Sequence, residues 1–393
     1  MLKKEDYMRI DGMRIEGKTW AEIKDKLNNE FKVNYDESAY RKPYTAYKRG
    51  LEDSVVDTDF VEQMQRIEIE KKKLSVLRGA NGEIVRDLAL RELYQEQILE
   101  AISSLPSIRY NTDIKHRAPN EEDKYYEYVM ILSDLHYDGD FNLEEIFTHI
   151  LEKTQDYIEK NKISAIDIAE LGDVIEGASL RPSQLRGIKT GMIPQIITVS
   201  EHYCRFLEQL QVSTGVYIEF HTVTSSNHTQ LRPLNTKRNE LPDEDLMQVF
   251  YSFLKERFKD NPMIYINGDE DIIIELIGRS EYKKPKTTKM FLSHGHKYKL
   301  TPNTLVSVSK NISMYQDEIY DYYGYGHYHQ YRDMAIDKSN GKDSRAFLFP
   351  ALAPKKDSYE RLGLMGCAPA FTILTFLNGT HEKTELFRSI SYD

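Results

Sequence analysis

Five short motifs, each at the end of an apolar run that predicts a β-strand, constrain this 393-residue sequence more than any other feature. Taken singly they are ordinary, since a Gly-Asp pair is a common turn and a lone loop histidine usually has no special role. Together they hold six of the eleven histidines, which chance does not readily produce. The motifs are, in chain order, Asp134-Leu-His136, Gly172-Asp173, Asn227-His228, His294-Gly-His296 and Gly326-His327-Tyr-His329.

The chemistry of these side chains predicts a site for two metal ions. Carboxylate, amide and imidazole ligands without thiolates suit divalent ions such as manganese, iron or zinc, and they disfavour calcium. Pairs of such ions, about 3.5 to 4 Å apart, promote the hydrolysis of phosphate esters by binding the attacking and leaving oxygens. The motifs therefore indicate a hydrolase.

The order of predicted elements indicates an α/β fold. Apolar runs at 128–132, 163–171, 216–224, 290–292 and 319–325 precede the five motifs, and helical periodicity intervenes at 143–160, 193–210 and 243–258. Open α/β sheets bind ligands beyond the carboxyl ends of their strands, which is where the motifs lie. The expected fold is a β-sheet core covered by helices.

Composition limits the setting in which such a protein acts. Two cysteines, Cys204 and Cys367, rule out a disulfide framework and fit a reducing cytoplasm. We find no secretion signal at the N-terminus and no apolar stretch of membrane-spanning length, so we expect a cytoplasmic protein with no membrane partner. The net charge of −10 argues against general attraction to polyanions, although local basic segments can override it.

The first 124 residues predict an all-helical appendage, divided into a helical unit at 1–50, a charged helical segment at 51–105 and a linker at 106–124. In the first unit Thr19 is a candidate N-cap, and Trp20, Ile23 and Leu27 share one helical face. The basic, tyrosine-rich stretch at 36–50 predicts either the second helix of a helix-turn-helix unit or a helical pair that packs on another surface. Pro43 should kink or delay a helix there.

The segment 51–105 carries apolar residues at spacings that resemble a coiled-coil seam. A Gly79-Ala-Asn-Gly82 stretch interrupts the pattern, so an antiparallel hairpin competes with one long helix. Either arrangement must pair with itself, with another copy or with the catalytic domain, and of these we expect a homodimer formed through this arm. The seam residues are Ile67, Leu74, Leu77, Ile84 and Leu88.

The five motifs, in their order, spacing and strand context, resemble the calcineurin-like metallophosphoesterase superfamily over residues 125–393. The resemblance implies a four-layer sandwich of two β-sheets flanked by helices, with 345–350 and 370–376 as strands of the second sheet. It implies two divalent ions, with Mn²⁺ preferred and iron, zinc or magnesium as alternatives. One ion would be bound by Asp134, His136 and His329 and the other by Asn227, His294 and His327, with Asp173 bridging them.

The resemblance also assigns supporting roles near the metals. His228 would contact the phosphate and protonate the leaving oxygen, a role that suits the ordinary pKa of an imidazole. Glu176 and His296 would contact the ligands without binding metal themselves, and Glu176 could orient His228. Thr229 stands where many members have an acidic residue, which removes one means of orienting His228, and Ser226 replaces a usual glycine.

The substrate is predicted from a narrower resemblance and from charge. A helical N-terminal unit, a charged helical segment and this domain, in that order, resemble phage and prophage proteins similar to DNA repair exonucleases of the SbcD type. This implies a Mn²⁺-dependent DNA nuclease in the cytoplasm of a bacterial host, with an ATPase as a possible partner. Two loops carry cations that could bind neighbouring phosphates, or that are merely solvated. These cations are Arg181, Arg186, Lys189, Arg232, Lys237 and Arg238.

Two other functions fit parts of the sequence. A phosphomonoesterase or protein phosphatase needs the same metals but no helical arm or basic loops. A DNA-binding or assembly protein with a vestigial catalytic domain would account for Thr229 and for the possible helix-turn-helix unit.

Overall fold

The structure is a computed structural model that describes residues 3–55, 96–113, 125–177, 188–231, 244–278, 286–301, 303–337, 344–353 and 367–390. The chain divides after Glu92 into two compact units, which are considered separately. Most of the segment predicted as a coiled coil or hairpin lies outside the described residues, so the expected homodimer stays a prediction. No helix in the described part of the chain is long and apolar enough to cross a membrane.

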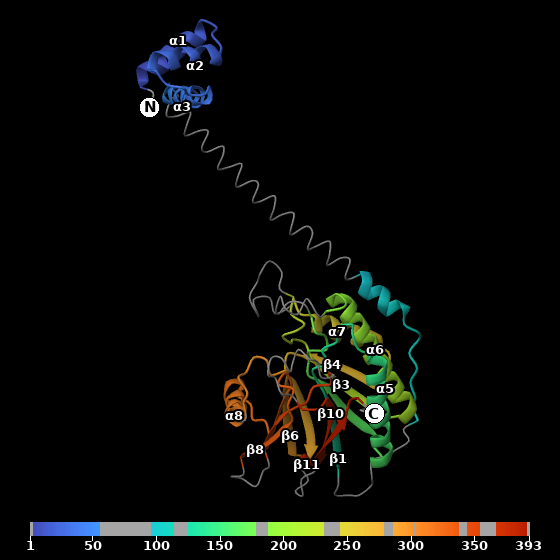
Figure 1. The fold of residues 1–393 in the computed structure, drawn as a ribbon. Helices are drawn as coiled ribbons and strands as arrows, with labels where there is room; N and C mark the ends of the chain where they lie inside the picture. The colour runs from blue at the N-terminus through green and yellow to red at the C-terminus, as the bar shows by residue number, and fades with distance from the viewer. Residues whose placement is uncertain are drawn as a thin grey trace. The chain divides into compact units, whose positions relative to one another are not determined.

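The N-terminal unit contains three helices, α1 (Lys4–Ile15), α2 (Trp20–Phe31) and α3 (Ser38–Val55), shown in blue in Figure 1. As predicted, Thr19 caps α2, accepting from the backbone N–H of Glu22 at 3.3 Å. Helix α3 runs through Pro43, so the predicted delay of this helix is wrong. The unit has its own small apolar core, made of Ile10, Met13, Ile23, Leu27, Tyr40 and Tyr44.

The second unit is built on a six-stranded sheet in the order β11-β10-β1-β2-β3-β4. Strands β1 to β4 are parallel, because helices connect them on one face, whereas β10 runs antiparallel to β1 and pairs Tyr126 with Leu377. The sequence placed 370–376 in the second sheet, and this is wrong, since β10 lies beside β1. The strands are β1 (Tyr126–Leu132), β2 (Ala165–Glu170), β3 (Tyr217–Val223), β4 (Ile264–Asp269), β10 (Ala370–Leu377) and β11 (Thr380–Arg388).

A five-stranded sheet in the order β5-β6-β7-β9-β8 packs against the first. Its central strands alternate sides: Tyr322 of β7 faces the other sheet, with its ring 5.0 Å from that of Phe376, while Tyr323 and Tyr325 face outwards. As expected, 345–348 falls in this sheet. The strands are β5 (Ile272–Gly278), β6 (Lys286–Ser293), β7 (Tyr322–Tyr325), β8 (Arg332–Asp337) and β9 (Ser344–Leu348).

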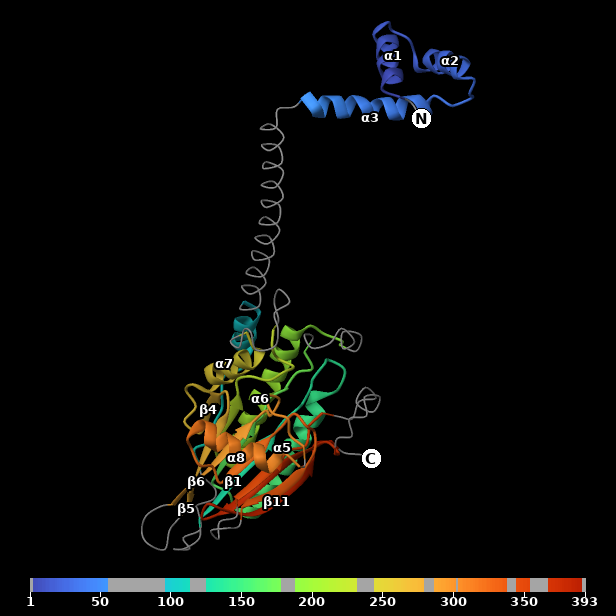
Figure 2. The same ribbon diagram turned by 90° about the vertical axis from the view of Figure 1, so that its left-hand side faces the viewer.

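Helices cover both outer faces, which completes the predicted four layers (Figures 1 and 2). Helices α5 (Leu143–Asn161), α6 (Met192–Thr214) and α7 (Leu246–Phe258) pack on the six-stranded sheet, and α8 (Leu305–Gln316) packs on the five-stranded one. The core is therefore divided into one large cluster, shared by both sheets and three helices, and a smaller one under α8. The α/β sandwich expected from the sequence is confirmed.

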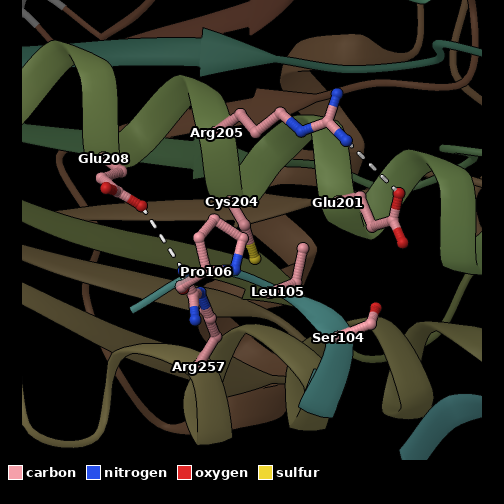
Figure 3. A pocket seen from close by; sticks show the side chains of 8 residues that line it. All are labelled: Ser104, Leu105, Pro106, Glu201, Cys204, Arg205, Glu208 and Arg257. Atoms are coloured by element: carbon pink, nitrogen blue, oxygen red, sulfur yellow. Dashed lines mark hydrogen bonds and ion pairs between the residues drawn. The ribbon is translucent and has the colours of Figure 1, made fainter. Parts of the chain in front are cut away.

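Residues 96–113, which precede the first strand, dock on the same body. The backbone N–H of Asn111 donates to Gln211 of α6 at 2.8 Å, and the guanidinium of Arg257 in α7 donates to the carbonyl of Pro106 at 2.5 Å. A cavity of about 280 Å³ remains between this segment and the helices, beside the buried Cys204 (Figure 3). It contains none of the predicted site residues. Part of the sequence-predicted linker is thus packed against the domain that follows it.

Candidate metal centre

The predicted ligands lie on loops that leave the carboxyl ends of parallel strands. Asp134 and His136 follow β1, and Asp173 follows β2. The two loops run side by side, since the backbone N–H of Asp134 donates to Gly172 O at 3.0 Å and that of His136 to Asp173 O at 2.9 Å. The parallel pairing of β1 with β2 therefore continues past the strand ends and fixes one ligand loop against the other.

Five of the seven predicted ligands have a left-handed backbone. Their φ angles lie between 48° and 65°, a region that few residues other than glycine adopt. Each such residue costs on the order of 1–3 kcal/mol unless its surroundings enforce it, and such residues concentrate at functional sites. This strain was not predicted from the sequence, and five of the nine positive-φ residues other than glycine in the described part of the chain lie in the motifs: Asp134, His136, Asp173, His327 and His329.

One group of candidate ligands consists of Asp134, His136 and His329. Asp134 Oδ1 lies 3.2 Å from His329 Nε2 and 3.6 Å from His136 Nε2, and the two imidazole nitrogens lie 3.1 Å apart. The other carboxylate oxygen of Asp134 accepts from Ser133 Oγ at 2.5 Å and from the backbone N–H of His327 at 2.8 Å. One oxygen is therefore fixed by the protein, and the other points at the histidines.

A second group consists of Asp173, His294 and His327, with Asn227 beside it. The Nδ1 atom of His294 lies 2.7 Å from the carbonyl oxygen of Leu171, so it must carry the proton of the hydrogen bond between them. In the neutral ring the lone pair is then on Nε2, which faces Asn227 Oδ1 at 2.9 Å and Asp173 Oδ2 at 3.0 Å. Three electron-rich atoms thus converge, an arrangement that a cation stabilises.

Asp173 lies between the two groups. Its Oδ2 atom is 3.0 Å from His294 Nε2 and 3.9 Å from His136 Nε2, which belong to different groups. Within the described residues, Asp173 Oδ2 and Asp134 Oδ1 are buried oxygens that accept no hydrogen bond. Buried carboxylate oxygens are normally paired, so these two fit a pair of divalent cations with Asp173 as the shared ligand.

The buried carboxylates of the site need positive charge beside them. Burial opposes ionisation of Asp134 and Asp173, yet the adjacent histidines outweigh it and hold the pKa of both carboxyl groups well below the ordinary value. Burial alone would lower the pKa of His136, but Asp134 and Glu176 raise it to about 10. Burial lowers the pKa of His327 to about 4. The carboxylates thus favour a proton on His136, at the place where an ion would bind.

His228 points into this centre from the loop after β3. Its backbone N–H donates to Asp173 Oδ1 at 3.0 Å, and its Nε2 atom lies 3.9 Å from Asp173 Oδ2. The Nδ1 atom lies 2.6 Å from the backbone oxygen of Glu176, and the Glu176 carboxylate lies 3.3 Å from His136. The ring of His296 lies beside those of His294 and His327, at 5.2 and 6.4 Å.

Ser226, Thr229 and Asp245 form a buried support that sequence reasoning missed. The backbone N–H of Asp173 donates to Ser226 Oγ at 3.0 Å, and Ser226 Oγ contacts Thr229 Oγ1 at 2.8 Å. Asp245, the N-cap of α7, accepts from the backbone N–H of Ser226 at 3.1 Å. The two departures from the superfamily pattern therefore hold the bridging residue in place. Only the position of Asp245 just before a helical run could have signalled its role.

The cations predicted to bind substrate are mostly not described. Lys189 is exposed, and its ammonium lies 3.9 Å from Asp140, a loose ion pair. The remaining candidates, Arg181, Arg186, Arg232, Lys237 and Arg238, lie outside the described residues, and their roles stay predictions.

Comparison with known sequences relates the chain to a prophage protein. It is 26% identical over 351 residues to the SPbeta prophage-derived uncharacterized protein YonJ of Bacillus subtilis, an alignment that covers 85% of this chain and 83% of that protein. The model of the YonJ N-terminal domain family matches residues 9–57, which include most of the helical unit α1 to α3.

The solved structures that resemble this chain include a calcineurin-like phosphoesterase and a metallophosphoesterase. Vps29 of Entamoeba histolytica, complexed with zinc, is 12% identical, with a TM-score of 0.31, over 67% of this chain and 99% of that chain. The calcineurin-like phosphoesterase YfkN of Bacillus subtilis is 10% identical, with a TM-score of 0.29, over 68% and 91%. A metallophosphoesterase of Sphaerobacter thermophilus is 10% identical, with a TM-score of 0.28, over 67% and 89%.

Proposed function

We propose that this protein is a two-metal phosphodiesterase that hydrolyses DNA. The observation that carries the proposal is the convergence of two ligand groups on Asp173, whose buried Oδ2 atom lies within 3.9 Å of imidazole nitrogens from both. When bound, two divalent ions would activate a water molecule for attack on phosphorus and stabilise the leaving oxygen. The ligands present suit manganese, iron or zinc better than calcium.

His228 is placed to move a proton during the reaction. The carbonyl of Glu176 fixes the proton of the neutral ring on Nδ1, which leaves Nε2 facing the centre. An imidazolium formed at Nε2 would protonate the leaving oxygen, and the neutral ring would accept a hydrogen bond from a bound group. His228 shares a possible ligand group with His136 and Asp173 but is in neither group that holds Asp134 or His294. We expect it to act on the substrate, so its replacement should affect turnover more than metal content.

The choice of DNA depends on cations that follow the site residues in the sequence. Lys189 and the predicted cations at 181, 186, 232, 237 and 238 belong to the loops that follow Asp173 and His228 in the sequence. Cations there would bind the phosphates on either side of the one that is cleaved, which a monoester substrate lacks. The similarity to a prophage protein is compatible with a role in DNA metabolism.

The experiment compares three substrates with purified protein and Mn²⁺: linear DNA, bis-p-nitrophenyl phosphate and p-nitrophenyl phosphate. We expect degradation of DNA and of the diester, with loss of both in EDTA and in Asp173→Asn. Turnover of the monoester alone would favour a phosphomonoesterase or protein phosphatase. Tight, salt-sensitive DNA binding without turnover in any divalent metal would favour a DNA-binding protein with a vestigial catalytic domain.

A charge variant separates DNA binding from chemistry. Replacing Arg232, Lys237 and Arg238 with alanine should slow DNA degradation at least tenfold and leave the small diester nearly unchanged, because only DNA has neighbouring phosphates. Replacing the exposed Lys153 and Lys160 of α5 is the matched control. Equal losses on both substrates would contradict the DNA assignment.

A further inference from the structure

Glu176 occupies a point where the two ligand loops are held together. Beyond the ends of β1 and β2, the backbone N–H of Tyr137 donates to Val174 O at 3.2 Å, and that of Glu176 donates to Tyr137 O at 2.9 Å. These bonds add to those that already join the loops at Asp134 and His136. Glu176 is therefore fixed beside His136 by backbone pairing.

The carboxylate of Glu176 faces the ring nitrogen of His136 that points away from the centre. Its Oε2 atom lies 3.3 Å from His136 Nδ1, with 15% of the Glu176 side chain and 2% of the His136 side chain exposed. The other ring nitrogen, Nε2, lies 3.1 Å from His329 Nε2 and 3.6 Å from Asp134 Oδ1. A carboxylate that contacts the ring nitrogen facing away from the metal keeps the proton on that nitrogen and makes the other ring nitrogen a better metal ligand.

The backbone of the same residue holds the second histidine. The Glu176 carbonyl oxygen lies 2.6 Å from His228 Nδ1, and the rings of His228 and His136 meet edge to face at 4.4 Å. The next residue must be glycine for this approach, since a Cβ atom on Gly177, whose φ is +68°, would lie 1.9 Å from His228 O. The loop therefore brings His228 to the backbone of Glu176, while the side chain of Glu176 is directed to His136.

We propose that Glu176 is a positioning residue with two separable roles. Its carboxylate orients His136 as an Nε2 ligand of one cation, and its carbonyl, independently of the side chain, orients His228. This proposal differs from the expectation that the side chain of Glu176 orients His228. The proposal rests on the metal centre described above, and its test measures metal binding apart from turnover.

The test is calorimetric titration of metal-free protein with Mn²⁺, comparing wild type with Glu176→Ala and Glu176→Gln. In Glu176→Ala, affinity for one ion should fall about 10–100-fold while the other ion binds as in wild type, because His136 shares a group with Asp134 and His329 and is not in the group of His294 and His327. Glu176→Gln should lose less, since its amide oxygen can still accept from Nδ1–H. Glu145→Ala, an exposed carboxylate on α5, is the control and should bind both ions normally.

Thermal unfolding in EDTA checks that each variant folds, and Glu176→Gln serves if the alanine variant does not. Wild-type affinity for both ions in Glu176→Ala would overturn the proposal, as would an equal loss at both sites. Diester turnover with both ions bound, at saturating Mn²⁺, tests the second role, since Glu176→Gln keeps the carbonyl that contacts His228 Nδ1 and should turn over as wild type. A lower turnover with both ions bound would mean that the carboxylate acts on His228. A wild-type protein that binds no metal would refute the proposed function as a whole.

Discussion

Metal binding should release a proton from His136, and this prediction can be made quantitative. The neighbouring carboxylates overcome the effect of burial and raise the pKa of His136 to about 10, so the metal-free ring is protonated at pH 7. A ligand nitrogen must lose its proton before it binds a metal. Moving that proton to solvent at pH 7, three units below the pKa, costs about 4 kcal/mol of the binding free energy.

The affinity for the ion that His136 binds should rise with pH. Between pH 6 and 8, where His136 stays protonated without metal, the apparent affinity of its ion should rise about tenfold per pH unit. His327, with a pKa of about 4, is already neutral and should add no proton to the release. Burial lowers the pKa of His228, so that residue should contribute little.

Calorimetry in two buffers measures the released protons. Titrations with Mn²⁺ at pH 7 in PIPES and in Tris, whose ionisation enthalpies differ, give the number of protons as the slope of observed enthalpy against buffer enthalpy. We expect a release of at least one proton in wild type and in the control His202→Gln on α6. Metal binding with no proton release, or an affinity that does not change between pH 6 and 8, would refute the reasoning.

Three further predictions concern single side chains. Asp173→Ala should lose both ions and all metal-dependent turnover, as measured by elemental analysis and diester hydrolysis, and retention of two ions would show that Asp173 does not bridge. His228→Ala should keep both ions but lose about 10²–10⁴-fold in turnover, the usual contribution of a general acid, and loss of metal would make it a ligand instead. Glu170 is fully buried against Gly172 N–H and the Tyr203 hydroxyl, and burial raises its pKa to about 8, so the neutral carboxyl favours folding. The stabilising effect of this neutral carboxyl is complete below its unfolded pKa of about 4.5 and is lost as pH rises through about 8. Glu170→Gln should therefore flatten the decline of Tm in EDTA between pH 5 and 9. An unchanged decline would contradict the raised pKa of Glu170.

The sequence predicted much of the second unit because its signals there are local. Apolar runs that end in polar motifs identify strands whose carboxyl ends meet, and helices α5, α6 and α7 fall where the periodicity indicated. The misplaced strand β10 shows the limit. Its residues Ala370 to Phe376 are almost uniformly buried, as they would be in either sheet, and its partner Tyr126 is some 250 positions earlier in the chain. Composition identifies such a strand but does not choose its neighbour.

The supports of the site were harder to predict than the ligands. Glu176 was singled out by its spacing from Asp173, but which ring its carboxylate contacts depends on how two loops pair beyond their strands. Ser226 and Thr229 were read as departures from a family pattern, and their contribution depends on Asp245, which is sixteen or more positions away. Contacts of this kind are set by tertiary packing and have no local sequence signal.

In two ligand loops, the residue between the two ligands is anchored in the protein and holds the left-handed backbone on either side of it. Asp134 and His136 both have positive φ, and Leu135 between them is completely buried in the core. His327 and His329 likewise flank Tyr328, whose hydroxyl accepts from the backbone N–H of Leu300 at 2.9 Å. Burying a leucine contributes about 1.5–3 kcal/mol, similar to the cost of one of the two left-handed residues beside it. The Asp134-Leu-His136 and His327-Tyr-His329 motifs therefore each anchor the middle residue in the protein and direct the outer two into the metal centre.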